Sequence, residues 1–300
     1  MKTPHPKPRG TEERNPRSHD LDQLPTLALV RAIHREDALV LGALRRELPT
    51  IARAVDLIAR SLARGGRLIY VGAGTSGRLA ALDAAECPPT FGVSPRLVQA
   101  VMAGGRRALT KSVEGAEDSA AQGARDLAAK RVGQGDVVVG LSASGATPYV
   151  LGALTVARRR GAATIGVTAN RPSLLSRVAR ITIAPATGPE VVAGSTRLKA
   201  GTAQKLVLNM LSTAAMIRLG HVYEGWMVDV SPTNQKLRRR ALRILQETTG
   251  ASELQAVIAL AQAGNRLRVA LVMLKMGTGA PEAQRWLKRA GDNLRRALGE

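Results

Sequence analysis

The stretch RLIYVGAGTSGRLAALDAAECPPTFG, from Arg67 to Gly92, decides the fold that the rest of the chain is expected to adopt. An apolar run over 68–71 predicts a buried strand, and the small residues of 72–77 predict a tight turn after it. A helical pattern begins at Arg78 and is expected to stop at the Cys-Pro-Pro sequence that starts at Cys87. Strand, turn and helix in this order present free backbone N–H groups at a helix N-terminus, which favours a bound anion.

Further apolar runs predict a sheet in which strands alternate with helices. The runs lie at 97–102, 136–141, 163–168 and 179–184, and helical patterns lie among them at 116–129 and 148–159. The run at 136–141 is almost wholly apolar, which is typical of a strand buried on both faces. This alternation indicates βαβ units, so we expect an α/β fold with a doubly wound parallel sheet.

The turn at 71–77 has a second copy at 139–145, because both match V-G-x-(G/S)-x-S-G. Each copy follows a predicted strand, and loops at the carboxyl ends of parallel strands gather around one crevice. Small and hydroxyl-bearing residues in two such loops suit a sugar phosphate. The residues that we expect to contact it there are Thr75, Ser76, Gly77, Ser142, Ser144, Gly145 and Thr147.

Two other interpretations of these turns stay open. Gly72, Gly74 and Gly77 have the spacing of a dinucleotide-binding loop, but the acidic ribose contact expected about 20 residues further on is missing at 89–92. Both loops could also be tight turns without a ligand, although such turns do not require paired Ser-Gly at matching places.

The segment 194–201 opens a long helical pattern that runs to about Gly220. Arg197, Lys199 and Lys205 lie near its start, where cations oppose the helix dipole. An anionic ligand would explain this unfavourable placement, so Lys199 joins the predicted phosphate contacts. A solvated basic surface is the alternative.

Helical patterns flank the predicted sheet on both sides. Residues 1–20 resemble an extended arm, and two helices are expected over 21–64. Amphipathic segments follow the sheet at 237–248, 252–263, 266–274 and 281–298, with glycines between them. We therefore expect an N-terminal arm and helices over 1–56, a sugar-phosphate domain over 57–235, and a C-terminal helical bundle over 236–300.

The composition indicates a soluble cytoplasmic protein with an aliphatic core. Apolar residues make up 45% of the 300 residues and aromatic residues only 2%, and no apolar run approaches the roughly 18 residues of a membrane span. The N-terminus lacks the apolar core of a secretory signal, and the single cysteine, Cys87, excludes an internal disulfide or a Cys-rich metal site. The net charge of +21 would attract polyanions, but scarce aromatics argue against stacking on bases. We expect neither a nucleic-acid nor a membrane partner.

Two acidic positions are candidate catalysts. Glu86 comes ten residues after Ser76, at the far end of the same predicted helix, and Glu114, Glu117 and Asp118 cluster at the start of another helix. Taken alone, each is better explained as a surface or helix-start acid. Beside a sugar-phosphate site, however, two carboxyl groups from neighbouring loops can act as general acid and general base.

Several of these segments together carry a family resemblance. They are VGAGTSGRLAALDAAECPPTFG, SVEGAED, GLSASGATPYV and GSTRLKAGTAQKLVLNM, and the N-terminal TEERNPRSHDLDQL extends the match. From Thr11 to about Leu237, and more weakly beyond, the chain closely resembles the N-acetylmuramic acid 6-phosphate etherases, members of the SIS (sugar isomerase) superfamily. The resemblance implies a SIS, flavodoxin-like sheet and a C-terminal bundle similar to ubiquitin-associated domains.

The same resemblance implies a reaction. These etherases cleave the D-lactyl ether at C3 of N-acetylmuramic acid 6-phosphate by elimination and hydration, which yields N-acetylglucosamine 6-phosphate and D-lactate and salvages cell-wall sugar. The family's proton-donor glutamate falls on Glu86, and its second catalytic glutamate falls on Glu117. For Glu86 to hold a proton at neutral pH, its pKa must be raised by burial or by a neighbouring carboxylate. The resemblance also implies a homodimer with sites near its interface, and neither a metal nor an organic cofactor.

One position departs from the family pattern. Etherases of this kind often read S-G-R-T-P in the second loop, whereas this chain reads S-G-A-T-P over 144–148, with Ala146 in place of the arginine. A guanidinium is thus missing near the proposed ligand. Either the affinity is lower, or Arg78, Arg197 or Lys199 compensates.

Three alternatives belong to other functional classes. A non-catalytic sugar-phosphate sensor, similar to glucokinase regulatory protein, would need no acid pair. A SIS-type transcription regulator would carry a helix-turn-helix domain ahead of the sugar domain, and the N-terminal helices have no clear recognition helix. An aldose–ketose isomerase of the same superfamily is the nearest chemical rival, and its substrate would separate it.

Overall fold

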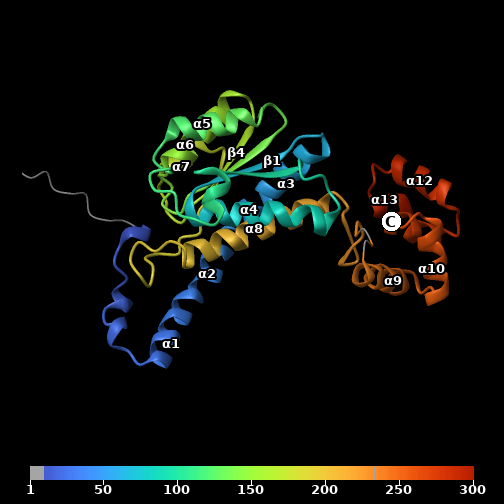
Figure 1. Ribbon diagram of the computed structural model, residues 1–300, viewed down its shortest axis with the longest axis horizontal. Coiled ribbons are helices and arrows are strands. Elements are labelled where there is room, and N and C mark those ends of the chain that lie inside the picture. Colours follow the sequence, from blue (N-terminus) through green and yellow to red (C-terminus); the bar gives the residue numbers. More distant parts are fainter. Residues whose placement is uncertain (1–9, 231, 233) are drawn as a thin grey trace, which may run out of the picture. The chain divides into compact units, whose positions relative to one another are not determined.

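The computed structural model describes residues 10–230, 232 and 234–300, which divide into two compact units (Figure 1). The first unit contains the described chain up to Ala85 together with Arg96–Ser212, and the second contains Glu86–Pro95 and Thr213–Glu300. The division after residues 56 and 235 that the sequence indicates stays a prediction, because the boundaries of these compact units lie elsewhere.

A parallel sheet of five strands, in the order β2-β1-β3-β4-β5, forms the centre of the first unit. The strands are β1 (Leu68–Gly72), β2 (Val98–Met102), β3 (Val137–Leu141), β4 (Ala163–Val167) and β5 (Ile181–Ile183). Every residue of β1 and of β3 is buried, as their apolar sequences predict. The doubly wound α/β fold is confirmed, and its strand order is flavodoxin-like.

Helices cover both faces of this sheet (Figure 1). On one side lie α5 (Ala120–Ala129), α6 (Pro148–Arg159) and α7 (Leu174–Val178). Their apolar side chains, including Leu127 and Leu154, pack with Ile69 of β1 and Val138 of β3. On the other side lie α3 (Leu48–Ala63) and the parts of α4 (Gly74–Phe91) and α8 (Lys199–Arg218) that belong to this unit.

The N-terminal part of the described chain differs from the expected arm and two helices. Three helices are present, because α1 (Thr26–Asp37) and α2 (Leu39–Arg45) precede α3. Short 3₁₀ turns at Gly10–Glu12, Pro16–Ser18 and Leu21–Gln23 come before them. An extended arm is wrong for residues 10–20, since Thr11 and Asn15 are buried and hydrogen-bonded to the body of the unit. The expectation for residues 1–9 lies outside the described residues.

Helix α4 is longer at both ends than the sequence pattern predicts. It begins at Gly74 rather than Arg78, and it passes through Pro88 and Pro89 to Phe91, so the expected stop at the Cys-Pro-Pro sequence is wrong. Proline suits the helical φ but has no N–H to donate. The last turn nevertheless closes, because the N–H of Gly92 donates to the carbonyl of Pro88 at 2.9 Å. The left-handed φ of +64° at Gly92 then ends the helix.

Several other boundaries differ because capping groups override the apolar pattern. Helix α5 begins at Ala120 rather than residue 116, since the Ser119 hydroxyl accepts the N–H of Gln122 at 3.1 Å. The expected C-terminal helix over 281–298 is two helices, α12 (Ala280–Arg289) and α13 (Leu294–Leu298). Asp292 has a φ of +58° between them, and the Asn293 side chain caps α13. Helix α7 and a hairpin of β6 (Val222–Tyr223) and β7 (Trp226–Met227) were not predicted, because each is short.

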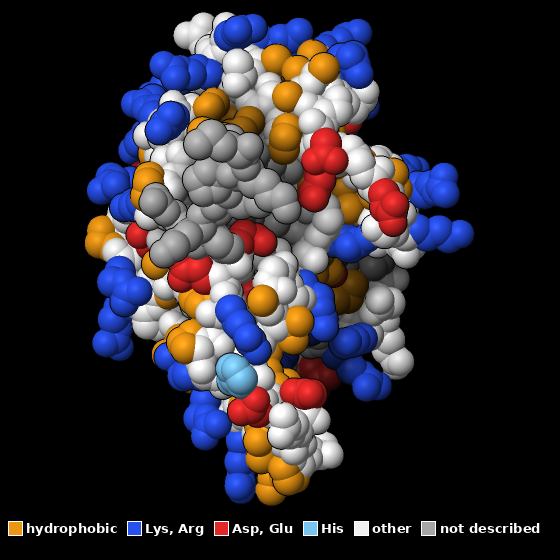
Figure 2. Space-filling view, turned by 90° about the vertical axis from the view of Figure 1, so that its left-hand side faces the viewer, with side chains coloured by type: hydrophobic (Ala, Val, Ile, Leu, Met, Phe, Trp, Pro, Cys, Tyr) orange, Lys and Arg blue, Asp and Glu red, His pale blue; other side chains and the backbone are white. Residues whose placement is uncertain are grey.

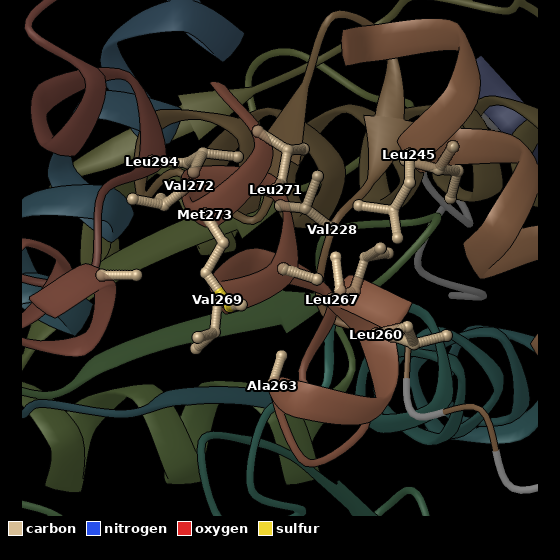
Figure 3. Close-up of a cluster of buried hydrophobic side chains, with 14 of the residues drawn as sticks. Val228, Leu245, Leu260, Ala263, Leu267, Val269, Leu271, Val272, Met273 and Leu294 are labelled. Atoms are coloured by element: carbon tan, nitrogen blue, oxygen red, sulfur yellow. The ribbon is translucent and has the colours of Figure 1, made fainter. Parts of the chain in front are cut away.

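The second unit is largely helical, as the amphipathic segments predict. Besides α12 and α13 it contains α9 (Gln235–Thr249), α10 (Glu253–Gln262) and α11 (Leu267–Met276). Helix α11 is central to its core, since residues from 267 to 273 meet Leu245 of α9, Leu260 of α10 and Leu294 of α13 (Figure 3). The C-terminal helical bundle is therefore confirmed.

Candidate active site

The two glycine-rich loops meet where the strand order of the sheet reverses. Chain connections run outward from β1 to β2 and then back to β3, and ligands bind at such a switch point in open α/β sheets. Gly72 at the end of β1 pairs with Met102 of β2 and with Leu141 of β3. The loops after β1 and β3 therefore leave the sheet at the same level. This brings together the two copies of the repeat found in the sequence.

The first loop turns tightly from β1 into α4. A Cβ atom on Gly72 would lie 2.7 Å from the nitrogen of Gly77, and one on Gly77 would lie 2.9 Å from the oxygen of Gly72. Only glycine allows this approach of strand end and helix start. Thr75 is half-buried and Ser76 is buried in the first turn of α4, whose N–H groups have no carbonyl partner within the helix. These N–H groups and hydroxyls form an anion-binding helix N-terminus.

The second loop is shaped by the hydroxyl of Ser142, which is 2% exposed. This oxygen accepts the N–H of Gly145 at 3.0 Å and lies 2.7 Å from the hydroxyl of Thr147. Gly145 has a φ of +72°, and a Cβ atom there would lie 2.5 Å from Cβ of Ser173. Ser144 and Thr147 are half-buried. Ser142 therefore organises the loop, whereas Ser144 and Thr147 are better placed to reach a ligand.

The start of α8 lies against both loops. Ala143 of the second loop, Ala169 and Ala200 of α8 form one small apolar cluster. A Cβ atom on Gly201 would lie 3.6 Å from Cγ2 of Thr75 in the first loop. The three segments that the sequence singles out as anion-binding therefore converge at one edge of the sheet.

The positive end of α8 already has a carboxylate partner within the chain. Glu190 is fully buried, and its two oxygens accept the backbone N–H groups of Lys199 and Ala200 at 3.0 and 2.9 Å. The Lys199 ammonium lies 2.6 Å from Glu36 and is 1% exposed. The unfavourable placement of Lys199 at this helix start is thus explained by internal carboxylates. Because the Lys199 side chain is buried in this ion pair, its position does not support the expected contact with a phosphate.

Glu36 joins the N-terminal turns to the rest of the first unit. Besides Lys199, its carboxylate accepts Asn15 Nδ2 at 2.8 Å and Arg17 Nε at 2.5 Å. Burial alone would raise the pKa of Glu36, but the hydrogen bonds from Arg17, Lys199 and Asn15 outweigh it and lower the pKa to about 2. Sequence reasoning missed Glu36 and Glu190, because nothing local distinguishes them from surface acids.

Glu117 lies beside the first loop, as the sequence argument requires. It occupies a turn before α5 rather than the helix itself, and its backbone oxygen accepts the N–H of Tyr149 at 3.0 Å. A cavity of about 290 Å³ is lined by Gly74 and Arg78 of α4 and by Glu114 and Glu117. The carboxylate is exposed. Glu117 can therefore approach a ligand held at the start of α4.

Glu86 lies near the end of α4 and belongs to the second unit. Its side chain is exposed, while its neighbours Cys87 and Phe91 are buried. This chain therefore does not supply the burial that a proton-donating role would require of Glu86.

The three cations that could replace the missing guanidinium at position 146 differ in availability. Arg78 donates to the carbonyl oxygens of Leu109 and Lys111, at 3.2 and 3.4 Å. Lys199 is buried in its ion pair. Arg197 is exposed, so of the three it is the cation best able to meet a ligand.

Asp83 is a buried acid on α4 that the sequence analysis did not single out. Tyr70 Oη and Ser212 Oγ donate hydrogen bonds to its carboxylate at 2.8 and 3.1 Å. Burial raises the pKa of Asp83, and these two hydrogen bonds offset the effect only in part. An acid within the alanine-rich pattern of this helix is the one signal that could have drawn attention to it.

The surface charge, possible membrane helices and possible metal groups complete the description of the chain. On the face drawn in Figure 2, lysine and arginine side chains are dispersed among other residue types rather than joined into one patch. No helix in the described part of the chain combines the length and apolar character that crossing a bilayer would take. Nor, among residues 10–230, 232 and 234–300, do three or more His, Cys, Asp or Glu side chains form a group that could hold a metal ion.

Comparisons with known proteins define the class of the first unit. A model of the glucokinase regulatory protein N-terminal SIS domain matches residues 50–158, and the SIS domain model matches residues 111–214. A phosphoheptose isomerase from Francisella tularensis has the same fold, with a TM-score of 0.51 at 18% identity over 65% of this chain and 100% of that one. Together with the parallel sheet and its two ligand loops, these matches make the chain a SIS-domain protein.

More similar relatives define the family. An N-acetylmuramic acid 6-phosphate etherase of Symbiobacterium thermophilum is 57% identical over 267 residues, which are 89% of this chain and 89% of the relative. An etherase of the same name from Serratia proteamaculans is 53% identical over 288 residues, which are 96% of this chain and 97% of the relative. The chain belongs to the N-acetylmuramic acid 6-phosphate etherase family. The resemblance read from the sequence motifs is confirmed.

Proposed function

We propose that this protein is a carbon–oxygen lyase that cleaves the D-lactyl ether of N-acetylmuramic acid 6-phosphate, giving N-acetylglucosamine 6-phosphate and D-lactate. The observation that carries the proposal is the identity of more than half of the aligned residues with two etherases over nearly the whole chain. The loops at the switch point of the sheet support a sugar-phosphate ligand independently.

The phosphate of the substrate binds at the two glycine-rich loops. Thr75 and Ser76 supply hydroxyls and N–H groups at the start of α4, where the helix dipole favours negative charge. Gly77, whose N–H donates to the carbonyl of Ala73 at 3.1 Å, allows the close approach of helix and strand that shapes this site. In the second loop the contacts come from Ser144 and Thr147, with Ser142 and Gly145 holding the loop in shape. Lys199 acts on this site through the packing of α8, because its ammonium is bound to Glu36.

Glu117 and Glu86 divide the proton transfers of the reaction. In the open-chain sugar the aldehyde acidifies the C2–H bond, and the Glu117 carboxylate takes that proton. The electron pair forms a C2–C3 double bond, the C3–O bond breaks, and Glu86 gives a proton to the departing lactate oxygen. Water then adds across the double bond, with its hydroxyl going to C3 and a proton to C2. The product is N-acetylglucosamine 6-phosphate.

The working form is a homodimer in the cytoplasm, where the enzyme serves amino-sugar recycling from the cell wall. Helices α1 and α2 support the dimer, because large apolar side chains lie exposed along them, among them Leu27 at 61%, Val30 at 54% and Leu41 at 67%. An exposed apolar surface of this kind marks an interaction site.

Lactate release tests the proposed function directly. The purified protein is incubated with N-acetylmuramic acid 6-phosphate, and D-lactate is measured for the wild type, Glu86→Gln, Glu117→Gln and the matched control Asp118→Asn. Asp118 is an exposed acid next to Glu117 that does not line the cavity. We expect lactate from the wild type and the control, and a loss of about 100-fold or more from each glutamine variant.

A sugar-phosphate-binding regulator is the alternative, and the match to the glucokinase regulatory protein domain gives it a specific basis. Binding of the substrate without lactate release from the wild type would favour it over the etherase.

A further inference from the structure

The end of α4 that carries Glu86 is weakly held by the helix itself. Pro88 and Pro89 follow two and three residues after Glu86, and neither can donate a hydrogen bond to the residue four positions earlier. Consecutive proline residues therefore remove two helical hydrogen bonds beside the acid. The direction of this last turn must depend on the groups against which it packs.

Two residues of the second unit pack against that turn. The ring of His221 meets the ring of Phe91 edge to face, with centroids 6.4 Å apart and planes at 62°. Gly92 lies directly on Asp229, since a Cβ atom on Gly92 would lie 2.7 Å from the oxygen and 2.8 Å from Cβ of Asp229. The end of α4 thus rests on His221 and Asp229, which flank the β6–β7 hairpin.

His221 and Asp229 are joined to each other and to α11 through one carboxylate oxygen. His221 Nδ1 lies 2.6 Å from Oδ2 of Asp229, and Arg268 Nη2 donates to the same oxygen. The Arg268 side chain is 11% exposed, and it also donates to the carbonyl oxygens of Gly220 at 3.1 Å and of Asp292. Arg268 lies in α11 between Leu267 and Val269, and these two residues are part of the core drawn in Figure 3.

These contacts join α11 to Phe91 and Gly92 at the end of α4, five and six residues after Glu86. Charge-assisted hydrogen bonds to a partly buried carboxylate are among the strongest polar contacts in proteins. Arg268 binds Asp229, Asp229 lies within hydrogen-bond distance of the His221 ring, that ring packs on Phe91, and Asp229 lies against Gly92.

We propose that His221 and Asp229, held by Arg268, are positioning residues that fix the last turn of α4 and so set the direction of the Glu86 carboxyl. The inference rests on the proposed function, because it assumes that Glu86 donates the proton. The second unit then has a part in the chemistry, because its residues set the direction of the Glu86 carboxyl.

His221→Ala and Asp229→Asn test this, with Tyr223→Phe as a matched control. Tyr223 lies in the same hairpin region and is buried, and its hydroxyl bonds to Lys275 and Glu300 rather than to α4. Lactate release gives kcat and KM for each variant and for Glu86→Gln. Misplacing an acid should lower kcat by about tenfold or more and change KM by less than about threefold. The control should keep the wild-type kcat.

A second substrate separates positioning of the acid from general damage. In the 3-chloro-3-deoxy analogue of N-acetylglucosamine 6-phosphate, loss of the C2 proton expels chloride, which needs no proton to leave. His221→Ala, Asp229→Asn and Glu86→Gln should release chloride at rates within about threefold of the wild type, because proton removal at C2 does not use the acid.

The outcomes distinguish this inference from the proposed function. Full lactate activity in Glu86→Gln would show that Glu86 does not donate the proton, whatever the other variants do. Loss in Glu86→Gln with wild-type kcat in both His221→Ala and Asp229→Asn would overturn the positioning role alone. Equal losses of lactate and chloride release in the His221 and Asp229 variants would also overturn it, because they would indicate general damage. If His221→Ala does not fold, Asp229→Asn carries the test, since it keeps the side-chain shape and removes the charge.

Discussion

The ammonium of Lys199 and the carboxylate of Glu36 form an ion pair at 2.6 Å in which the two side chains are only 1% and 5% exposed. The pair joins α1 to the start of α8, beside the second glycine-rich loop. Replacing Lys199 by methionine would leave the Glu36 charge buried with fewer partners. We expect a loss of about 3–5 kcal/mol in the free energy of unfolding, measured by urea denaturation.

The double variant Lys199→Met with Glu36→Leu is the control for that loss. Removing both charges should recover part of the stability, because an apolar pair carries no desolvation cost. A Lys199→Met variant as stable as the wild type would contradict a structural role for this lysine. Lys199 would then again be a candidate for the phosphate.

The lowered pKa of Glu36 predicts a specific acid sensitivity. Its folded-state pKa of about 2 lies below the ordinary value of 4.5, so the unfolded chain binds the proton first as the pH falls. The stabilisation is therefore fully present above about pH 4.5 and is lost as the pH falls toward 2. Unfolding free energies measured across this window should fall less steeply for Glu36→Gln than for the wild type. Parallel curves would contradict the assignment.

Gly77→Ala should disturb the turn that forms the phosphate site. The added Cβ would lie 2.8 Å from Cγ of Met102 and 2.9 Å from the oxygen of Gly72, which is strand backbone and cannot move freely. We expect a cost of about 1–3 kcal/mol in unfolding free energy together with a raised KM. Gly133→Ala is the matched control, because no atom lies within 4 Å of its added Cβ. Equal behaviour of the two variants in urea denaturation and kinetics would argue against the close approach.

The sheet and its loops were predictable because their signals are local. Apolar runs bounded by glycine give β1 and β3, and the Ser-Gly repeat marks the loops after them. Parallel strand geometry then brings the loops together without further information. The choice of Glu117 among the acids of its segment rests instead on the family resemblance, because these local signals do not separate it from Glu114 and Asp118.

The remaining features depend on residues far apart in the chain. Glu36 and Lys199 are separated by 163 positions, so no spacing rule connects them. The cations at the start of α8 predicted an external anion, and the chain's own Glu36 and Glu190 stand there instead. The end of α4, which contains two prolines, packs on His221, a residue 130 positions after Phe91, so a local pattern does not contain this contact.

The exposed apolar face of α1 and α2 predicts that Leu41→Asp weakens the homodimer. Leu41 is 67% exposed, and in Figure 2 hydrophobic side chains are visible at the lower end of the view, where Figure 1 draws α1. A buried charge at a dimer contact should lower the affinity by about tenfold or more, as measured by sedimentation equilibrium. Leu254→Asp is the control, since Leu254 is 69% exposed on α10. A similar effect of both changes, or of neither, would count against this interface.

Ala146→Arg should restore a substrate contact that this chain lacks. Ala146 is exposed in the second loop, and its N–H donates to the hydroxyl of Ser144 at 3.2 Å, so a longer side chain can be added without a buried clash. A guanidinium there can donate to the phosphate, and a charge-assisted hydrogen bond of roughly 1.5 kcal/mol would lower KM by about tenfold.

Ala261→Arg adds the same charge at an exposed position of α10, so it measures any general attraction of a more basic protein for a phosphorylated substrate. Lactate release at varied substrate concentration gives KM for both variants. If Ala146→Arg leaves KM unchanged, the exposed Arg197 already meets the need for a cation, and Arg197→Ala should then raise KM. If neither variant changes KM, the loop hydroxyls and the N–H groups of α4 bind the phosphate without a cation.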